Sequence, residues 1–358
     1  MKIFSCTKCG NLLYFENVTC TQCGASLGFL PDSMRLTALE SAGGNEWQAS
    51  GTEQRYRMCA NYSRHAVCNW MVKAGTDLDF CEACSLNRTI PDLSVEKHRK
   101  LWRTLETEKR RLIYSLLNFD LPVVSRKQDP AGLAFDFLAD EPARFSERGR
   151  VMTGHNQGLI TINIAEADPA ERERMRNQMA EAYRTILGHF RHESGHYYWD
   201  RLIRDTDRLQ PFRDLFGDDR IDYSKSLEKH YHDGPPADWQ QRFVSAYASS
   251  HPWEDWAESW AHYLHMVDTL ETAYQYGLAI RPVVVSANAR SAEHDFNAYG
   301  ERDFEVLIEH WFPLTFALNS LNRSMGHRHA YPFVLAPAAI DKLRFVHRVI
   351  WETVQHQR

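Results

Sequence analysis

The sequence has no hydrophobic run that approaches the ~20 residues needed to cross a membrane, and it has no repeats or low-complexity segments. Its first residues, MKIFSCTKCGNLLYF, lack the long apolar core of a signal peptide. The net charge of -5 is unlike the strongly basic composition that is typical of nucleic-acid-binding proteins. We therefore expect a cytoplasmic protein that binds neither a membrane nor nucleic acid.

Cysteine is absent from the whole chain after Cys84, which is the last of eight cysteines. Disulfide frameworks are unstable in a reducing cytosol, where clustered CxxC pairs more often bind metal. The 358 residues, 43% of them hydrophobic, suffice for two or three ordinary globular domains. We expect the cysteine-rich part, residues 1–92, to form a small first domain.

The first four cysteines form two CxxC pairs separated by ten residues, and a glycine follows each pair. Glycine lets the chain turn tightly beneath a bound metal, and four thiolates form the tetrahedral ligand set of a structural zinc site. The alternative, a redox CxxC, is usually found beside a βαβ pattern, which this segment lacks. The predicted ligands are Cys6, Cys9, Cys20 and Cys23.

A second zinc site is predicted from Cys59, Cys68, Cys81 and Cys84, of which only the last two form a CxxC pair. Buried free thiols are the alternative, and the two sites could also share cysteines crosswise. Residues 31–56, between the two cysteine sets, are polar and contain three glycines, so we expect a linker or a weak hairpin.

Beyond the cysteines, the pattern favours an α+β fold, mostly helical with one small mixed sheet. Hydrophobic residues at helical spacing predict a helix over 94–118. Residues 133–164 predict strands, and we expect 158–164 to be a sheet edge that a substrate backbone can join. A long polar helix is expected to begin near Pro169 and to continue into the segment 189–202. Charged loop is expected over 205–240, with helices over 239–248 and 252–266.

Residues 189–202, HFRHESGHYYWDRL, contain an HExxH motif. On a helix, His192 and His196 share one face, so that both imidazoles can bind one metal ion, and Glu193 can take a proton from a metal-bound water. The alternative is a pair of core histidines. A catalytic zinc site usually has three protein ligands and a water in the fourth position.

The third ligand is expected in the segment PWEDWAESWAHYLH. Glu254 and Glu258 lie four residues apart, so one can bind the metal while the other accepts the outer N–H of a ligand histidine. The residues alone leave the choice between these two carboxylates open, and His262 is a further alternative.

HESGH followed by EDWAE resembles the gluzincin zinc peptidases, and more closely the catalytic pattern of anthrax lethal factor. This resemblance implies that Glu254 is the third ligand, that Glu258 is the outer hydrogen-bond partner, and that Tyr247 donates to the oxyanion of the tetrahedral intermediate. Packing beside Phe243 is the alternative role of Tyr247. The whole layout also resembles a bacterial family of "putative zinc-binding metallopeptidases" with an N-terminal zinc ribbon, which implies a zincin-like domain over residues 93–358.

The expected function is a zinc-dependent metallopeptidase that hydrolyses a peptide or amide bond, with one catalytic and two structural zinc ions. Zinc would lower the pKa of its water toward ~7, and Glu193 would take the proton. The alternative is a zinc-ribbon adaptor protein whose hydrolase domain is inactive or highly partner-specific. The expected partners are a peptide or protein substrate and a protein bound at the ribbons, unless the ribbons are only structural caps.

Overall fold

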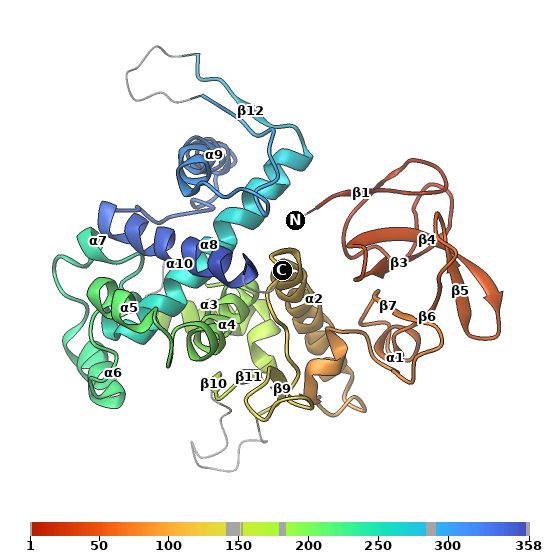
Figure 1. Cartoon of the computed structure of the whole chain (residues 1–358), viewed down its shortest axis with the longest axis horizontal. Coiled ribbons are helices and arrows are strands. Elements are labelled where there is room, and N and C mark those ends of the chain that lie inside the picture. Colours follow the sequence, from red (N-terminus) through yellow and green to blue (C-terminus); the bar gives the residue numbers. More distant parts are fainter. Residues whose placement is uncertain (1, 141–150, 152, 179–183, 284–290, 356–358) are drawn as a thin grey trace. The chain divides into compact units, whose positions relative to one another are not determined.

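The computed structural model describes residues 2–140, 151, 153–178, 184–283 and 291–355. They form two compact units, the first made of Met1–Asn118 and Pro122–Arg172, the second of Phe119–Leu121 and Glu173–Arg358. The first contains all eight cysteines and the second contains the HESGH segment (Figure 1). The α+β expectation is confirmed, since small sheets and a zinc-ribbon region precede a mostly helical part.

The first unit begins with a two-stranded hairpin and a five-stranded antiparallel sheet, whose strands pair in sequence order. The hairpin strands are β1 (Phe4–Ser5) and β2 (Leu12–Leu13). The sheet strands are β3 (Ser26–Leu30), β4 (Arg35–Gly43), β5 (Glu46–Ala49), β6 (Arg55–Met58) and β7 (Met71–Lys73). A short helix, α1 (Ala60–Ser63), lies between β6 and β7, and a 3₁₀ turn, η1 (Cys84–Leu86), follows β7.

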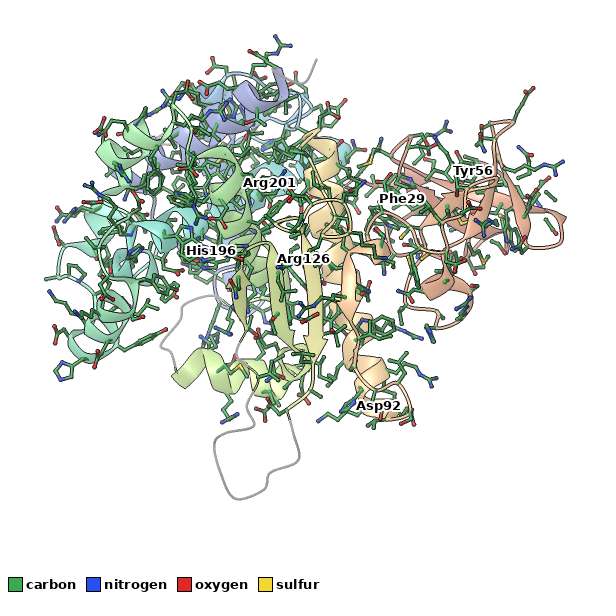
Figure 2. The ribbon with its side chains drawn as sticks, turned by 60° about the horizontal axis from the view of Figure 1, so that its bottom comes forward. Phe29, Tyr56, Asp92, Arg126, His196 and Arg201 are labelled. Atoms are coloured by element: carbon green, nitrogen blue, oxygen red, sulfur yellow. The ribbon has the colours of Figure 1, made fainter. Side chains whose placement is uncertain are left out.

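The expected linker over residues 31–56 is wrong, because these residues form β4, β5 and part of β6. The glycines that suggested a linker are turn residues: Gly43, Gly44 and Gly51 all have positive φ angles. The strands bury an apolar core around Tyr56, and a second aromatic cluster surrounds Phe29, whose ring lies 4.8 Å from that of Trp70 (Figure 2). The hairpin alternative was correct for β4 and β5.

Helix α2 (Glu96–Asn118) confirms the helix expected over 94–118. Its predicted apolar stripe is fully buried: Trp102, Leu105, Leu112, Ile113 and Leu116. The helix also buries three charged side chains that the apolar pattern does not predict, Glu106, Lys109 and Arg110. Lys109 pairs with Glu106 at 2.9 Å, and Arg110 donates to the carbonyl of Val67. The hydrogen bond of Arg110 joins α2 to the cysteine-rich segment.

A four-stranded mixed sheet completes the first unit, in the order β10-β11-β9-β8. Its strands are β8 (Asn87–Thr89), β9 (Ala134–Leu138), β10 (Gly154–Asn156) and β11 (Leu159–Asn163). The expectation that residues 158–164 form a sheet edge is wrong, because β11 pairs with β9 on one side and β10 on the other. A tight turn at Gln157 and Gly158, both with positive φ, reverses the chain so that β10 and β11 pair as an antiparallel hairpin.

The helix expected to run on from Pro169 is two helices, α3 (Pro169–Gln178) and α4 (Ile186–Leu202), of which α4 belongs to the second unit. Thr185 has an extended backbone, and its hydroxyl accepts the amide of Gly188 at 3.0 Å, which caps the start of α4.

The loop expected over 205–240 is also wrong, because it contains α5 (Leu209–Phe216) and α6 (Tyr223–Asp233). The helix expected over 239–248 is α7 (Trp239–Arg242) and a separate turn η4 (Tyr247–Ser250), since the backbone is extended at Phe243.

The remaining elements of the second unit are three longer helices and two short strands. They are α8 (Pro252–Gln275), β12 (Ala279–Ile280), β13 (Ala292–Glu293), α9 (Phe304–Ser324) and α10 (Pro337–Gln355). Among the described helices, none has the length and hydropathy to span a membrane.

Candidate metal centres and active site

Helices α4 and α8 carry the predicted catalytic residues, and a glycine sets how closely the helices approach. A Cβ placed on Gly195 would lie 2.9 Å from the Cα of Ala257, so no larger residue fits without movement. Two tryptophans of α8 then bond to the same turn of α4: Trp256 donates to the carbonyl of Gly195 at 2.8 Å and Trp260 to the hydroxyl of Ser194 at 3.1 Å. This packing fixes which faces of the two helices meet.

His192 and His196 lie one turn apart on α4 and face Glu254 in the first turn of α8 (His196 is labelled in Figure 2). Oε2 of Glu254 lies 2.9 Å from Nε2 of His192 and 3.5 Å from Nε2 of His196. Two ligands on tetrahedral zinc, with bonds of about 2.1 Å, lie about 3.4 Å apart. The three donor atoms therefore have the spacing and the chemistry of a zinc site, and all three side chains are buried.

Glu258 faces the other side of the His192 ring. Its Oε1 lies 2.8 Å from Nδ1 of His192, and its Oε2 accepts the hydroxyl of Ser245 at 2.6 Å. Burial opposes ionisation of Glu258, but the hydrogen bond from His192 and its charge outweigh burial and lower the pKa to about 2. Of the two candidate carboxylates, Glu254 thus lies on the Nε2 side and Glu258 on the Nδ1 side. The sequence carried no signal for Ser245.

Tyr223 is a site residue that the sequence analysis missed. It is the first residue of α6, and its hydroxyl donates to Oε1 of Glu254 at 2.6 Å. Partial burial raises the pKa of Tyr223, and the negative charge of Glu254 raises it further, so the hydroxyl stays protonated at neutral pH. The sequence predicts only a charged loop over 205–240, and no motif in it indicates a residue of the metal site.

Tyr247, in η4, lies close to His192 of the candidate metal site. Its ring centroid is 5.9 Å from that of His192 and 6.1 Å from that of His230. Burial raises the pKa of Tyr247, as does the nearby charge of Glu254. The ring of Phe243, the alternative packing partner, has the Lys342 ammonium above it, 4.2 Å from the ring centroid.

Glu193 is buried on α4 next to His192, and its Oε1 lies 3.9 Å from Nε2 of His189. Trp253 covers His196, with 4.1 Å between the ring centroids. His262, the further candidate ligand, is not part of the converging set, because its Nδ1 hydrogen-bonds the hydroxyl of Tyr331 at 2.8 Å. Burial lowers the pKa of His262 to about 4.

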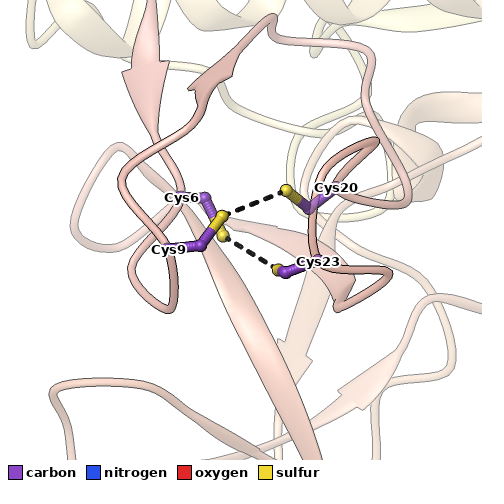
Figure 3. Close-up of side chains that lie close together, drawn as sticks. All are labelled: Cys6, Cys9, Cys20 and Cys23. Carbon is purple, nitrogen blue, oxygen red and sulfur yellow. Dashed lines mark hydrogen bonds between the residues drawn. The ribbon is translucent and has the colours of Figure 1, made fainter.

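The eight cysteines gather into two separate groups of four thiols, and none forms a disulfide. In the first group, Sγ of Cys6 lies 3.8 Å from that of Cys23, and Cys9 lies 3.6 Å from Cys20 (Figure 3). Sulfur ligands on tetrahedral zinc, with bonds of about 2.3 Å, lie about 3.8 Å apart, whereas a disulfide bond is about 2.0 Å long. The spacing fits zinc.

The second group has a different environment, although its Cys68–Cys81 sulfur distance is also 3.8 Å. All four of its cysteines are buried, whereas two of the first group are partly exposed. Cys84 lies 3.8 Å from a carboxylate oxygen of Glu106 on α2. Burial lowers the pKa of the nearby Arg110 guanidinium, but the charges of Cys68 and Glu106 outweigh burial and raise it. The second cysteine group therefore packs directly against α2.

Together these features define a class: a protein with a zinc-ribbon region and a helical part in which the two histidines of HESGH converge with a glutamate. The sequence model of the family described as "Putative zinc-binding metallo-peptidase" matches residues 98–349, and that of a "zinc-ribbon domain" matches residues 3–95. The chain belongs to this zinc-binding metallopeptidase family with an N-terminal zinc ribbon.

Relatives of the chain include "Uncharacterized protein Rv2568c" of Mycobacterium tuberculosis and "Uncharacterized protein Mb2598c" of Mycobacterium bovis. Each is 43% identical over 354 residues, which cover 98% of this chain and 96% of the relative. No solved structure matches the chain significantly.

Proposed function

We propose that the protein is a zinc-dependent metallopeptidase that hydrolyses a peptide or amide bond in a peptide or protein substrate. The observation that carries the proposal is the convergence of His192, His196 and Glu254, with Glu193 on the same helix, in a chain of a metallopeptidase family. When bound, zinc supplies a Lewis acid and a water whose pKa is near ~7.

Four side chains of the protein have separate roles in the proposed reaction. Glu193 takes the proton from the attacking water and passes it to the leaving amine. Tyr247 donates a hydrogen bond to the oxyanion of the tetrahedral intermediate. Glu258 accepts the Nδ1 proton of His192, which directs Nε2 toward the metal, and Ser245 holds Glu258 in that position.

The two cysteine groups complete the proposed metal content. We assign one structural zinc ion to each group, so that the chain holds two structural and one catalytic zinc ion. The proposed division into a ribbon region, residues 1–92, and a peptidase domain, residues 93–358, follows the same assignment. Eight reduced thiols suit a reducing compartment, and we propose a cytoplasmic location.

The test is Glu193→Gln, assayed for zinc content and for cleavage of a peptide library. Glutamine keeps the size of the side chain but is not a base, so the variant should bind as much zinc as the wild type and lose cleavage by a factor of 10² or more. Glu309→Gln, a change at an exposed carboxylate of α9, should behave as the wild type. Cleavage by Glu193→Gln at the wild-type rate would remove Glu193 from the reaction.

A further inference from the structure

We propose that Tyr223 is a positioning residue of the metal site, which holds Oε1 of Glu254 and thereby keeps this carboxylate monodentate toward the metal. The inference rests on the proposed function, because it takes Glu254 as the third zinc ligand. It adds a residue from α6 to a site otherwise built by α4, η4 and α8.

The two oxygens of Glu254 have different partners. Oε1 accepts the hydroxyl of Tyr223 at 2.6 Å, a short hydrogen bond to a charged acceptor. Oε2 faces the Nε2 atoms of His192 and His196, at 2.9 and 3.5 Å. The Tyr223 hydroxyl thus binds Oε1, the carboxylate oxygen that faces away from the two histidines.

This division matters for catalysis because of the number of ligand positions. A catalytic zinc ion needs three protein ligands and one open position for water. If both oxygens of Glu254 bound the metal, the carboxylate would compete for that open position. A donor fixed on Oε1 turns the carboxylate so that only Oε2 reaches the metal, and it lowers the electron density available at Oε1.

The placement of Tyr223 is built into the fold. Its ring contacts the start of α8, edge-on to His251 at 5.2 Å and to Trp253 at 5.8 Å. Asp222 caps α6 by accepting the amide of Lys225 at 3.0 Å, which fixes the backbone just before the tyrosine. None of the eleven residues of α6 is buried, so the helix has no core face of its own. Contacts of Tyr223 therefore place the start of α6 at the metal site.

The two tyrosines near the metal have separate roles in this arrangement. The Tyr223 hydroxyl is committed to Glu254, whereas the Tyr247 hydroxyl makes no hydrogen bond with any residue that the structure describes. Tyr247 can therefore turn toward a substrate oxyanion. Tyr223 cannot do so without releasing its carboxylate.

The experiment uses Tyr223→Phe in the full-length chain, since phenylalanine keeps the ring contacts and removes only the hydroxyl. A mild chelator withdraws the zinc of the histidine site while the thiolate sites keep theirs. Zinc is then titrated back and followed by tryptophan fluorescence, because Trp253 lies 4.1 Å from His196. Loss of an outer hydrogen-bond partner should weaken zinc binding about 10- to 100-fold. Tyr231→Phe, a change at an exposed tyrosine of the same helix, should bind zinc as the wild type does.

Cobalt added to the same depleted proteins gives the second readout, since its visible absorption weakens when coordination rises from four to five. A bidentate Glu254 should make the Tyr223→Phe difference spectrum weaker than that of the wild type. Unchanged zinc affinity together with an unchanged cobalt spectrum in Tyr223→Phe would overturn the positioning role. If the wild type itself takes up no metal at this site, the proposed function fails instead, so the two failures are distinguishable.

Discussion

Glu258 lies 2.8 Å from Nδ1 of His192, and Glu254 lies 2.9 Å from Nε2 of the same ring. One imidazole is thus held between two carboxylates of α8 that are one helical turn apart. Only the Nε2 side also faces His196, which favours Glu254 as the ligand and Glu258 as the outer partner.

Replacing Glu258 with alanine should weaken zinc binding at the histidine site about 10- to 100-fold, because the ligand ring loses its orienting acceptor. Chelator competition on the full-length chain measures this. Ser245→Ala removes only the support of Glu258 and should have a smaller effect in the same direction. Equal zinc affinity in Glu258→Ala and the wild type would contradict the outer-partner role.

Replacing Gly195 with alanine should lower the free energy of unfolding by about 1–3 kcal/mol, the usual range for an overpacked core. The new Cβ would lie 2.9 Å from the Cα of Ala257, so α4 and α8 must separate. Urea denaturation measures the loss, with Ser224→Ala on the exposed face of α6 as the control. A Gly195→Ala protein as stable as the control would show that the two helices do not pack this closely.

The two cysteine groups should respond differently to loss of one ligand. Cys84→Ser should remove one zinc ion and also expose the amides of α2 to hydrogen exchange, because this buried site contacts Glu106 of α2. Cys9→Ser should remove one zinc ion and leave α2 protected, because Cys9 is partly exposed and lies in the other group. Identical exchange of α2 in both variants would argue against a link between the second group and this helix.

Acid should destabilise the fold through His262. Burial lowers the pKa of His262 from 6.5 to about 4, so between these values the unfolded chain binds a proton that the folded chain does not. The free energy of unfolding therefore falls as the pH drops through this range, by up to about 3 kcal/mol.

His262→Asn keeps an acceptor for the Tyr331 hydroxyl but cannot be protonated, and so it should lose this part of the pH dependence. Denaturation at about pH 7 and about pH 5 compares the two proteins. Other buried histidines contribute equally to both, and an identical fall in stability would show that His262 titrates as it does in water.

The sequence predicts best where the signal is local. The four-residue spacing of His192 and His196 requires only a helix, and the first thiol group follows from its two CxxC pairs. The choice of Glu254 over Glu258 needed a family resemblance, because both share one helix face and only the approach of α4 separates them.

The failures share a physical cause. Helix α6 buries no residue and has only one short apolar row, Tyr223, Leu227 and Tyr231, in a polar segment, and Tyr223 contacts Glu254 across 31 positions of the chain. The apolar composition of β11 does not show whether the strand lies at an edge of the sheet. The turn at Gly158 pairs β10 with its free side. The contact between Tyr223 and Glu254 depends on three-dimensional packing that no short motif encodes, whereas the β10–β11 hairpin depends on a local turn.

The central claim is that His192, His196 and Glu254 hold a catalytic zinc ion apart from the two thiolate sites, and metal content measured together with peptide cleavage tests it most directly. The wild type should hold three zinc ions per chain and cleave, whereas His192→Ala should hold two and show no cleavage. Three zinc ions in His192→Ala, or cleavage that persists after the loss of one, would contradict the account.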